Sequence, residues 1–336
     1  MVPPALGKPT AAGGAPLAAQ ALWSCFGRNR HESRLVSPVL RAYSRTGMAL
    51  VNLTDLLKLY RVPKKTEDPA VESRAILKKV IQAAGAGFPV IRTRGALTHI
   101  IKPEKDGDFH FFVEPESFVE QPETPMMTCE IQNLNAPGAP ADKIAKFKQL
   151  AGEEVELTGL LRIWPEHLRN SAQPHFFEIH PVLTVGLVGG TPLDFHSQAT
   201  FPKVGPDANE PVKPFGTVLN PPNGLTLKLS GQRIVFKTPT HAFNKENYVR
   251  LVGRCSAAPT PVASGLWFTL QDEGAQHRPL RCFVAAGSPV FTKAQAVKVG
   301  NRYHVGGLGG LDMMALTASS LTWQPIFSPA LEILPA

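Results

Sequence analysis

The chain has 336 residues, enough for two ordinary domains, and 43% of them are hydrophobic, which indicates a globular protein. Its 32 prolines and 28 glycines favour many short strands and turns, and no apolar run reaches the roughly 20 residues that a membrane helix needs. The four cysteines form no Cys-x-x-Cys pair, which excludes a zinc knuckle, and we expect reduced thiols in a cytoplasmic protein.

The net charge of +8 is unevenly distributed along the chain. Residues 87–186 contain nine basic and fourteen acidic residues, whereas residues 187–336 contain thirteen basic and eight acidic ones. Because nucleic-acid phosphates attract Lys and Arg, a phosphate-binding surface is expected in the C-terminal part of the chain and not in the acidic middle part.

Residues 1–47 are rich in Ala, Pro, Gly and Arg, and Glu32 is their single acidic residue. Low acidity with several arginines is typical of a transit peptide, whereas a lack of hydrophobic periodicity is typical of a disordered extension. A start assigned too far upstream, with Met48 as the true first residue, would explain the same pattern. We therefore expect a disordered or targeting-like extension.

Regular structure is expected to begin with a helical segment at residues 48–87. Thr54 can cap a short helix, and Asp68 can cap a second helix that ends before Gly85. The second helix would carry one apolar stripe, made of Leu77, Val80, Ile81 and Ala84.

Residues 88–186 change to a period of two, which predicts strands. The expected strands are "PVIRTRGALTHII", "FHFFVEP", "MMTCEIQNL", "EEVELTGLLRIW" and "HFFEIHPVLTV", with "ADKIAKFKQLAG" as a helix between the third and fourth. This order of elements is that of an OB-fold, a five-stranded Greek-key barrel. We expect the first barrel to be acidic.

Residues 247–326 repeat this order and predict a second, basic barrel. Its strands are expected at "NYVRLVGRCSAAPT", "GLWFTLQDEG", "PLRCFVAAG", "NRYHVGGLGGLD" and "ALTASSLTWQP". Residues 187–246 are expected to form a linker with extra β-hairpins, in which 215–240 can also be read as part of a third barrel. Residues 327–336 are expected to be a tail. The predicted fold class is mainly β, with two OB-fold-like five-stranded barrels and a short helical N-terminal segment.

The strand patterns "YVRLVGRC", "LWFTLQDEG" and "RYHVGGL" are the best marked of these elements. By element order and strand patterning, the chain resembles tandem OB-fold nucleic-acid-binding proteins of the single-stranded-DNA-binding and anticodon-binding type. The resemblance covers about residues 88–186 and 247–326, and it implies single-stranded DNA or RNA as a partner.

Alternation divides the strands of the second barrel into two faces. The inward set is Val249, Leu251, Leu266, Phe268, Leu270, Leu280, Cys282 and Val284. The outward face then carries the candidate nucleic-acid-binding residues Arg250, Arg254, Trp267, Arg281 and Phe283. Aromatic rings stack on bases and guanidinium groups bind phosphates, so this face suits a single strand. In the competing interpretation, the face packs against residues 215–240 and is buried.

The stretch "RIWPEHLRNSAQPHFFEIH" contains a second candidate site, for a metal. Glu178 and His180 fall on one face of a strand. A third ligand would have to come from His167 in the preceding loop, or from His99 or His110 on neighbouring strands. The spacing differs from the His-Glu-x-x-His signature of zinc hydrolases, and barrel strands often carry His and Glu in hydrogen bonds. We therefore expect no metal and no cofactor.

These patterns lead to three hypotheses. The leading one is a non-catalytic protein that binds single-stranded nucleic acid mainly through the C-terminal barrel, without contact to a membrane. The second is a structural or protein–protein interaction module, in which the acidic first barrel binds protein partners. The third is a metal-dependent hydrolase centred on the first barrel.

Overall fold

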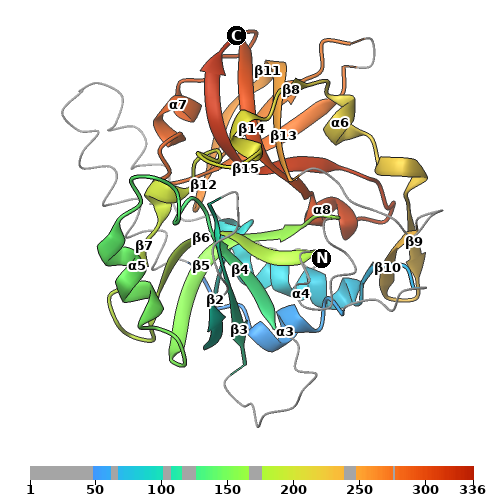
Figure 1. The fold of residues 1–336 in the computed structure, drawn as a ribbon. Helices are drawn as coiled ribbons and strands as arrows, with labels where there is room; N and C mark the ends of the chain where they lie inside the picture. Colours follow the sequence, from blue (N-terminus) through green and yellow to red (C-terminus); the bar gives the residue numbers. More distant parts are fainter. Residues whose placement is uncertain are drawn as a thin grey trace, which may run out of the picture.

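The computed structural model describes residues 48–61, 67–100, 107–115, 126–165, 176–237, 247–274 and 277–336. The chain is mainly β and contains two closed five-stranded barrels, which lie one above the other in Figure 1. The predicted extension over 1–47 lies outside the described residues. Among the described helices, none is both long and apolar enough to cross a membrane.

Barrel 1 is the lower barrel, drawn in cyan to green in Figure 1. Its elements are β2 (Val90–Ile100), β3 (Phe109–Glu114), β4 (Met127–Ile131), α5 (Ala141–Lys148), β5 (Glu154–Ile163) and β6 (Phe177–Leu187), with β7 (Leu193–Asp194) added at the edge of β6. β2 pairs with β3 and β5, and a parallel pair between β4 and β6 closes the barrel. This is OB-fold topology, as the element order predicted.

Barrel 2 is the upper barrel and has the same topology. Its elements are β11 (Tyr248–Val262), β12 (Gly265–Gln271), β13 (Pro279–Ala285), α7 (Phe291–Gln295), β14 (Arg302–Leu311) and β15 (Pro325–Pro335), with the short β8 (Val212–Lys213) beside β11. β11 pairs with β12 and β14, and β13 and β15 close the barrel as a parallel pair. All eight residues of the predicted inward set are buried in the core.

The fifth strand of barrel 2 lies further along the chain than the sequence indicated. Asp312 caps the short helix α8 (Met313–Leu316), because its carboxylate accepts hydrogen bonds from Met314 N and Ala315 N. The predicted strand "ALTASSLTWQP" is therefore helix and loop, and the predicted tail 327–336 belongs almost entirely to β15. The sequence did not predict this strand because it contains Pro325 and Pro329, and proline is disfavoured in sheets.

The N-terminal helices form as expected, but with other caps. Asn52 caps α3 (Leu53–Leu57), and Ser73 caps α4 (Arg74–Ala84), in place of the predicted Thr54 and Asp68. Ser73 caps α4 in place of Asp68 because the chain after Asp68 first forms β1 (Ala70–Val71). The predicted stripe of α4 is confirmed, because all four of its residues are buried.

The segment between the barrels contributes a small separate sheet. β1 pairs with β10 (Arg233–Lys237), which forms a hairpin with β9 (Thr226–Ser230). Short helical turns precede this hairpin: η2 (His196–Gln198), η3 (Asp207–Asn209), α6 (Gly216–Leu219) and η4 (Pro222–Gly224). Within the described residues, 215–237 thus form helical turns and a hairpin on a three-stranded sheet, and not a third barrel.

A separate apolar cluster joins the outer faces of the two barrels. Val90, Leu160 and Leu183 come from barrel 1, and Phe283, Ala285 and Leu308 come from barrel 2. The backbones approach closely at this junction: a Cβ atom on Gly309 would lie 2.5 Å from the ring of Trp164 in barrel 1. The glycines of β14 therefore let the backbone of barrel 2 pack closely against barrel 1.

Candidate functional site

The outer face of β12 and β13 carries an aromatic pair. Trp267 and Phe283 are cross-strand neighbours, with ring centroids 5.2 Å apart and planes tilted by 58°. Trp267 is half-buried, whereas Phe283 is fully buried. The predicted outward direction of both rings is correct, but only Trp267 reaches the surface. Phe283 belongs to an apolar cluster with Val90, Leu160 and Leu183 of barrel 1, and among the described residues of 215–237 none is in that cluster, unlike in the competing interpretation.

Arg281 lies beside this pair on β13. Its guanidinium carbon lies 4.2 Å from the centroid of the Trp267 ring, a cation–π contact. Arg281 Nη1 also donates to Asp312 Oδ2 at 2.8 Å, and its side chain remains 40% exposed. The carboxylate and the ring hold the guanidinium in place without removing it from solvent, so it can still contact a ligand.

Arg254 and Arg250 lie in different surroundings. Arg254, on β11 opposite Gln271 of β12, is half exposed, donates to Gly300 O and pairs with Glu273 at 3.0 Å. Arg250 pairs with Glu332 at 2.7 Å and lies 4.0 Å from the centroid of the Phe201 ring. It also donates to two backbone carbonyls of the segment before β8, which makes it a structural residue.

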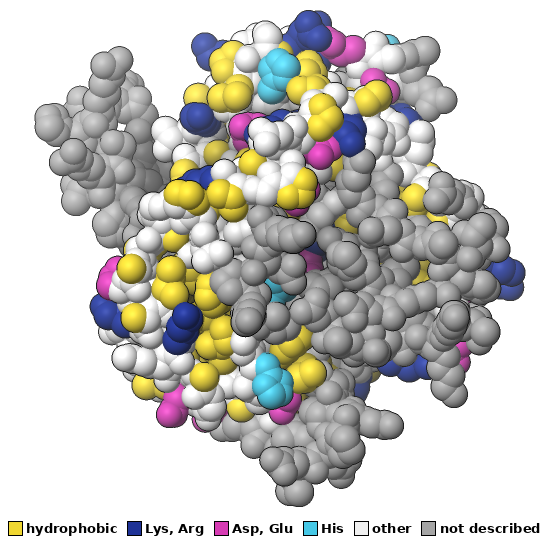
Figure 2. All heavy atoms as spheres, in the orientation of Figure 1, with side chains coloured by type: hydrophobic (Ala, Val, Ile, Leu, Met, Phe, Trp, Pro, Cys, Tyr) yellow, Lys and Arg dark blue, Asp and Glu magenta, His cyan; other side chains and the backbone are white. Residues whose placement is uncertain are grey.

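Basic and acidic side chains are therefore interspersed on barrel 2, which Figure 2 shows for the face in view. Each described arginine of the predicted site contacts a carboxylate. A ligand that binds here must compete with these carboxylates for the guanidinium groups. We accordingly expect moderate affinity that falls with salt.

The corresponding outer face of barrel 1 holds a buried polar network. His180, on β6, lies between two carboxylates: its Nδ1 is 3.0 Å from Glu130 Oε2, and its Nε2 is 3.5 Å from Asp108 Oδ2. His110 Nε2 contacts Glu130 Oε1 at 2.7 Å. From barrel 2, the hydroxyl of Tyr248 donates to Asp108 Oδ2 at 2.5 Å. These five side chains are at most 6% exposed.

A buried arginine extends the network to the backbone of barrel 2. Arg162, on β5, forms an ion pair with Glu178 and donates to Gly309 O and to Asn247 Oδ1. Glu178 also lies 3.4 Å from Nδ1 of His180. The prediction that Glu178 and His180 share a face is confirmed, and His167 lies outside the described residues.

The charges of the network determine the state of His180. Burial by itself lowers the pKa of an imidazole, but the negative charge of Glu130 and the contacts with Asp108 and Glu178 outweigh it, and the pKa of His180 is raised well above its ordinary value. Among the described residues, three buried carboxylates and the guanidinium of Arg162 belong to this network. A protonated imidazole compensates part of the negative charge of these carboxylates.

Asp108, Glu130 and His180 are also the group whose donor atoms could hold a metal ion, since these atoms lie within 4.8 Å of one another. However, both nitrogens of His180 already face groups of the protein: Nδ1 lies 3.0 Å from Glu130, and Nε2 lies 3.2 Å from the Tyr248 hydroxyl and 3.5 Å from Asp108. Side chains this deeply buried also offer no surface to a substrate. The described contacts are those of a buried ion network.

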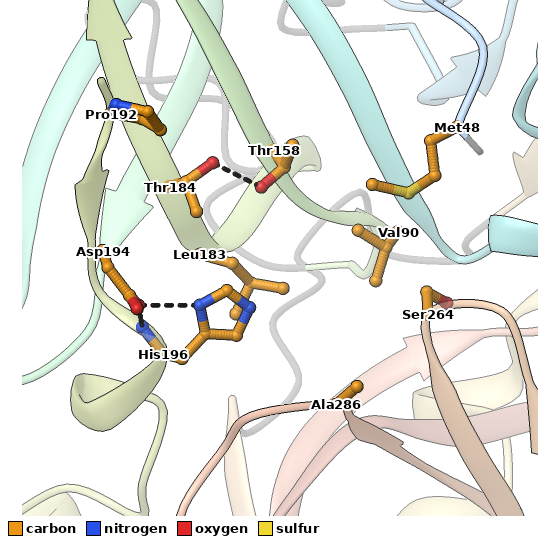
Figure 3. Close-up of a pocket in the computed structure, with 10 residues that line it drawn as sticks. All are labelled: Met48, Val90, Thr158, Leu183, Thr184, Pro192, Asp194, His196, Ser264 and Ala286. Atoms are coloured by element: carbon orange, nitrogen blue, oxygen red, sulfur yellow. Dashed lines mark hydrogen bonds and ion pairs between the residues drawn. The ribbon is translucent and has the colours of Figure 1, made fainter. Parts of the chain in front are cut away.

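A cavity lies where the two barrels meet (Figure 3). Val90, Thr158, Leu183 and Thr184 line it from barrel 1, and Ser264 and Ala286 line it from barrel 2. His196, on η2, enters from the side with its Nδ1 2.8 Å from Asp194 Oδ1. Sequence reasoning did not single out His196, because a His two residues after an Asp in a loop is a common local pair.

The sequence offered His110 as a possible metal ligand, but it did not connect His110 with Glu130 or Asp108 with Tyr248. Asp108 and Tyr248 are 140 residues apart, so no local pattern connects them. The cross-strand pair of His110 and Glu130 becomes visible once the register of β3 and β4 is known.

Comparisons with known proteins add little to this description. No protein-family model matches the chain, and no curated protein matches it. Among solved structures, the chain is similar to wild-type single-stranded DNA binding protein from Thermus aquaticus, with 12% identity, 74% of this chain and 91% of that chain covered, and a TM-score of 0.21. It is also similar to a murine DNA binding protein bound with ds DNA, with 12% identity, 73% and 99% covered, and a TM-score of 0.22. TM-scores this low carry no argument, so the OB-fold assignment rests on strand pairing.

Proposed function

We propose that this protein binds single-stranded nucleic acid, without catalysis, on the outer face of β12 and β13 in barrel 2. The observation that carries the proposal is the half-exposed Trp267 ring with the guanidinium of Arg281 stacked 4.2 Å from its centroid. An aromatic ring beside a cation can stack on any base and bind the adjacent phosphate.

The position of this pair in the fold supports the proposal. OB-folds bind oligonucleotides on the face of their second and third strands, and Trp267 and Arg281 lie on those strands of barrel 2. Phe283 supports the indole from below and gives it a fixed orientation. A rigid ring loses little conformational entropy when a base stacks on it.

Arg254 supplies a second phosphate contact in this proposal. It is half exposed, and its partner Gln271 on β12 is four residues from Trp267, about 13 Å at the usual rise of a strand. A bound strand would therefore run along β12 from the indole toward Arg254. We place this activity in the cytoplasm, which the free and buried Cys129, Cys255 and Cys282 suit.

The test is fluorescence anisotropy with a labelled single-stranded 20-mer at two salt concentrations. The full chain should bind more weakly at the higher salt, because cations bound to the phosphates are released on binding. Arg281→Ala should weaken binding. The matched control is Arg94→Ala in barrel 1, because Arg94 is also on a strand, 40% exposed and paired with a carboxylate.

Equal weakening by Arg281→Ala and Arg94→Ala would show that binding follows overall charge and does not use this face. Absence of salt-dependent binding to any single strand would contradict the proposed function itself. The double-stranded form of the same 20-mer serves as the comparison ligand, and we expect it to bind more weakly because its bases are already stacked.

A further inference from the structure

Two arginines of barrel 2 lie side by side on neighbouring strands and share one carboxylate. Arg254 of β11 is directly opposite Arg302 of β14 in the antiparallel register. Arg254 Nη2 lies 3.0 Å from Glu273 Oε1, and Arg302 Nη2 lies 3.0 Å from Glu273 Oε2. Each oxygen of the carboxylate therefore faces a different guanidinium. The three side chains are 36–52% exposed, so a solute can reach them.

This cluster lies at one end of the proposed binding face. Gln271 of β12 is the cross-strand partner of Arg254, and Arg302 is the partner of Arg254 on its other side. On each of the three strands an adjacent residue is buried in the core: Leu270, Cys255 and Tyr303. Because side chains alternate along a strand, both arginines lie on the outer face, as Trp267 does. A single strand that runs along β12 from Trp267 therefore reaches both arginines.

The two guanidinium groups favour an anion between them. Like charges directly opposite each other on antiparallel strands destabilise a sheet, and a negative group at the centre relieves the repulsion. Glu273 supplies one negative charge and two oxygens. A phosphodiester group of a nucleic acid also supplies one negative charge and two free oxygens, and guanidinium groups bind both kinds of oxygen. The carboxylate thus occupies a position that fits a backbone phosphate.

Barrel 1 contains a comparable cluster that is held more firmly. Arg92 donates to both oxygens of Glu156, at 2.7 and 2.8 Å, and Arg94 donates to Oε2 at 2.8 Å. The hydrogen bonds from Arg92 are the main reason why the pKa of Glu156 is lowered. Glu156 lies within β5 and is 24% exposed. Glu273 instead lies in the turn after β12 and makes one ion pair with each arginine.

Glu273 can leave the arginines by rotation of its side chain. The backbone of the turn has its own contacts: Asp272 N donates to Arg278 O at 3.1 Å, and Gly274 N donates to Asp272 Oδ1 at 2.9 Å. An exposed ion pair is worth only about one- to fivefold in an equilibrium constant, whereas a stacked base is worth about five- to a hundredfold. A strand anchored on Trp267 can therefore displace the carboxylate, and a free phosphate ion lacks this anchor.

We propose that Arg254 and Arg302 form a phosphate site for the bound single strand, and that the carboxylate of Glu273 occupies this site in the free chain. The inference rests on the function proposed above and adds to it a second arginine and an internal competitor. Glu273 lowers the affinity of the site for every phosphate, and it thereby restricts the site to phosphates of a strand that also stacks on Trp267.

The experiment measures binding of the labelled single-stranded 20-mer by anisotropy at low salt, in the full chain and four variants. Glu273→Gln removes the charge of the competing carboxylate and keeps its shape. Arg302→Ala removes one arginine, and a double variant combines the two changes. Glu156→Gln is the matched control, because it changes the net charge equally and also releases two arginines from a carboxylate. Melting temperatures confirm that each variant is folded.

We expect Glu273→Gln to bind the strand about fivefold more tightly than the full chain, the upper value for one exposed ion pair. Arg302→Ala should bind about threefold more weakly, because one phosphate contact is lost. The double variant should gain at most about twofold over Arg302→Ala, since Glu273 then competes for Arg254 alone. Glu156→Gln should remain within about twofold of the full chain, because its arginines lie outside the binding face.

An equal gain in Glu273→Gln and Glu156→Gln would show that affinity follows net charge alone. That result would overturn this inference and leave the proposed function intact, and so would a Glu273→Gln variant that binds no more tightly than the full chain. If neither the full chain nor Glu273→Gln binds any single strand, both proposals fail.

A second arm separates a strand phosphate from a free phosphate ion. The Nε–H signals of the arginines are followed by NMR in the full chain, and their comparison with Arg302→Ala identifies the signal of Arg302. At matched ionic strength, we expect the 20-mer to shift this signal and inorganic phosphate to leave it in place. If inorganic phosphate shifts it as strongly as the strand does, Glu273 does not restrict the site and the inference fails. A shift by inorganic phosphate without binding of any oligonucleotide would overturn both proposals.

Discussion

The second and third strands of the two barrels form the same outer face of the same fold, but the two faces carry opposite chemistry. In barrel 1 this face carries His110 and Glu130, at most 4% exposed, in a network that Tyr248 of barrel 2 completes. In barrel 2 it carries Trp267 and Arg281, which solvent still reaches.

The difference shows that topology does not decide which barrel is available to a ligand. Barrel 1 uses part of this face to contact barrel 2, and its charges neutralise one another there. In barrel 2, Phe283 belongs to the apolar junction, whereas Trp267 packs against that junction and is only partly buried. The alternative hypothesis that barrel 1 binds protein partners stays a prediction, and barrel 2 already occupies part of this face.

The two faces should differ most in the effect of removing one arginine from each, Arg162 in barrel 1 and Arg281 in barrel 2. Arg162→Ala should lower the free energy of unfolding by about 3–5 kcal/mol, because it removes one partner of a fully buried ion pair with Glu178. Arg281→Ala should cost about 0–1 kcal/mol, because that ion pair is largely exposed to solvent. Urea denaturation of both variants measures the two values. Similar losses would show that the faces do not differ in burial as described.

The network of barrel 1 should also make stability depend on pH. The pKa of His180 is raised in the folded protein, so its stabilising contribution is complete below the unfolded value of 6.5 and is lost as the pH rises through the folded value. The melting temperature of the full chain should therefore exceed that of His180→Gln by less at pH 9 than at pH 6.

His304→Gln, on β14 of barrel 2, is the control for this pH series, and we expect its difference from the full chain to stay constant. If the melting-temperature difference between the full chain and His180→Gln grows as the pH rises, His180 is neutral in the folded protein. In that case the carboxylates would need another source of positive charge.

Substitutions on the barrel 2 face should change the affinity for a single strand, whereas substitutions in the barrel 1 network should change stability. Trp267→Ala should weaken single-strand binding by about 1–3 kcal/mol, the usual value of one stacked base. Trp267→Phe keeps an aromatic ring on Phe283 and should retain most of the affinity. Titration of an unlabelled oligonucleotide against intrinsic fluorescence provides an independent signal, because a stacked base quenches an indole. Unchanged affinity in Trp267→Ala with a large loss of stability would mark the ring as purely structural.

The smallest expected effect concerns Arg254. Arg254→Ala should reduce the slope of log affinity against log salt by about one unit and change base preference little, since a phosphate contact carries no sequence information. Arg250→Ala should leave the slope unchanged, because that guanidinium is committed to Glu332 and to backbone carbonyls. A lower slope in Arg250→Ala would extend the binding face toward β8.

Much of the fold followed from local patterns. Alternation along β12 and β13 gave the correct register, because a slip by one residue would place Trp267 in the core and Leu266 outside. The fifth strand of barrel 2 was missed, because Pro325 and Pro329 disguise β15 and Asp312 begins a helix where a strand was expected. The site was predicted less well, since Phe283 and Arg250 have the expected strand positions but are engaged within the protein.

The sequence by itself determined the element order of both barrels and the two faces of their strands, because side chains alternate with a period of two in any register. Only the tertiary structure decided which outer faces are covered. Burial of Phe283, the contact of Tyr248 with Asp108 and the cavity beside His196 all arise where the barrels meet. Those contacts join residues far apart in the chain, and their energies depend on removing both surfaces from water together, which no local pattern encodes.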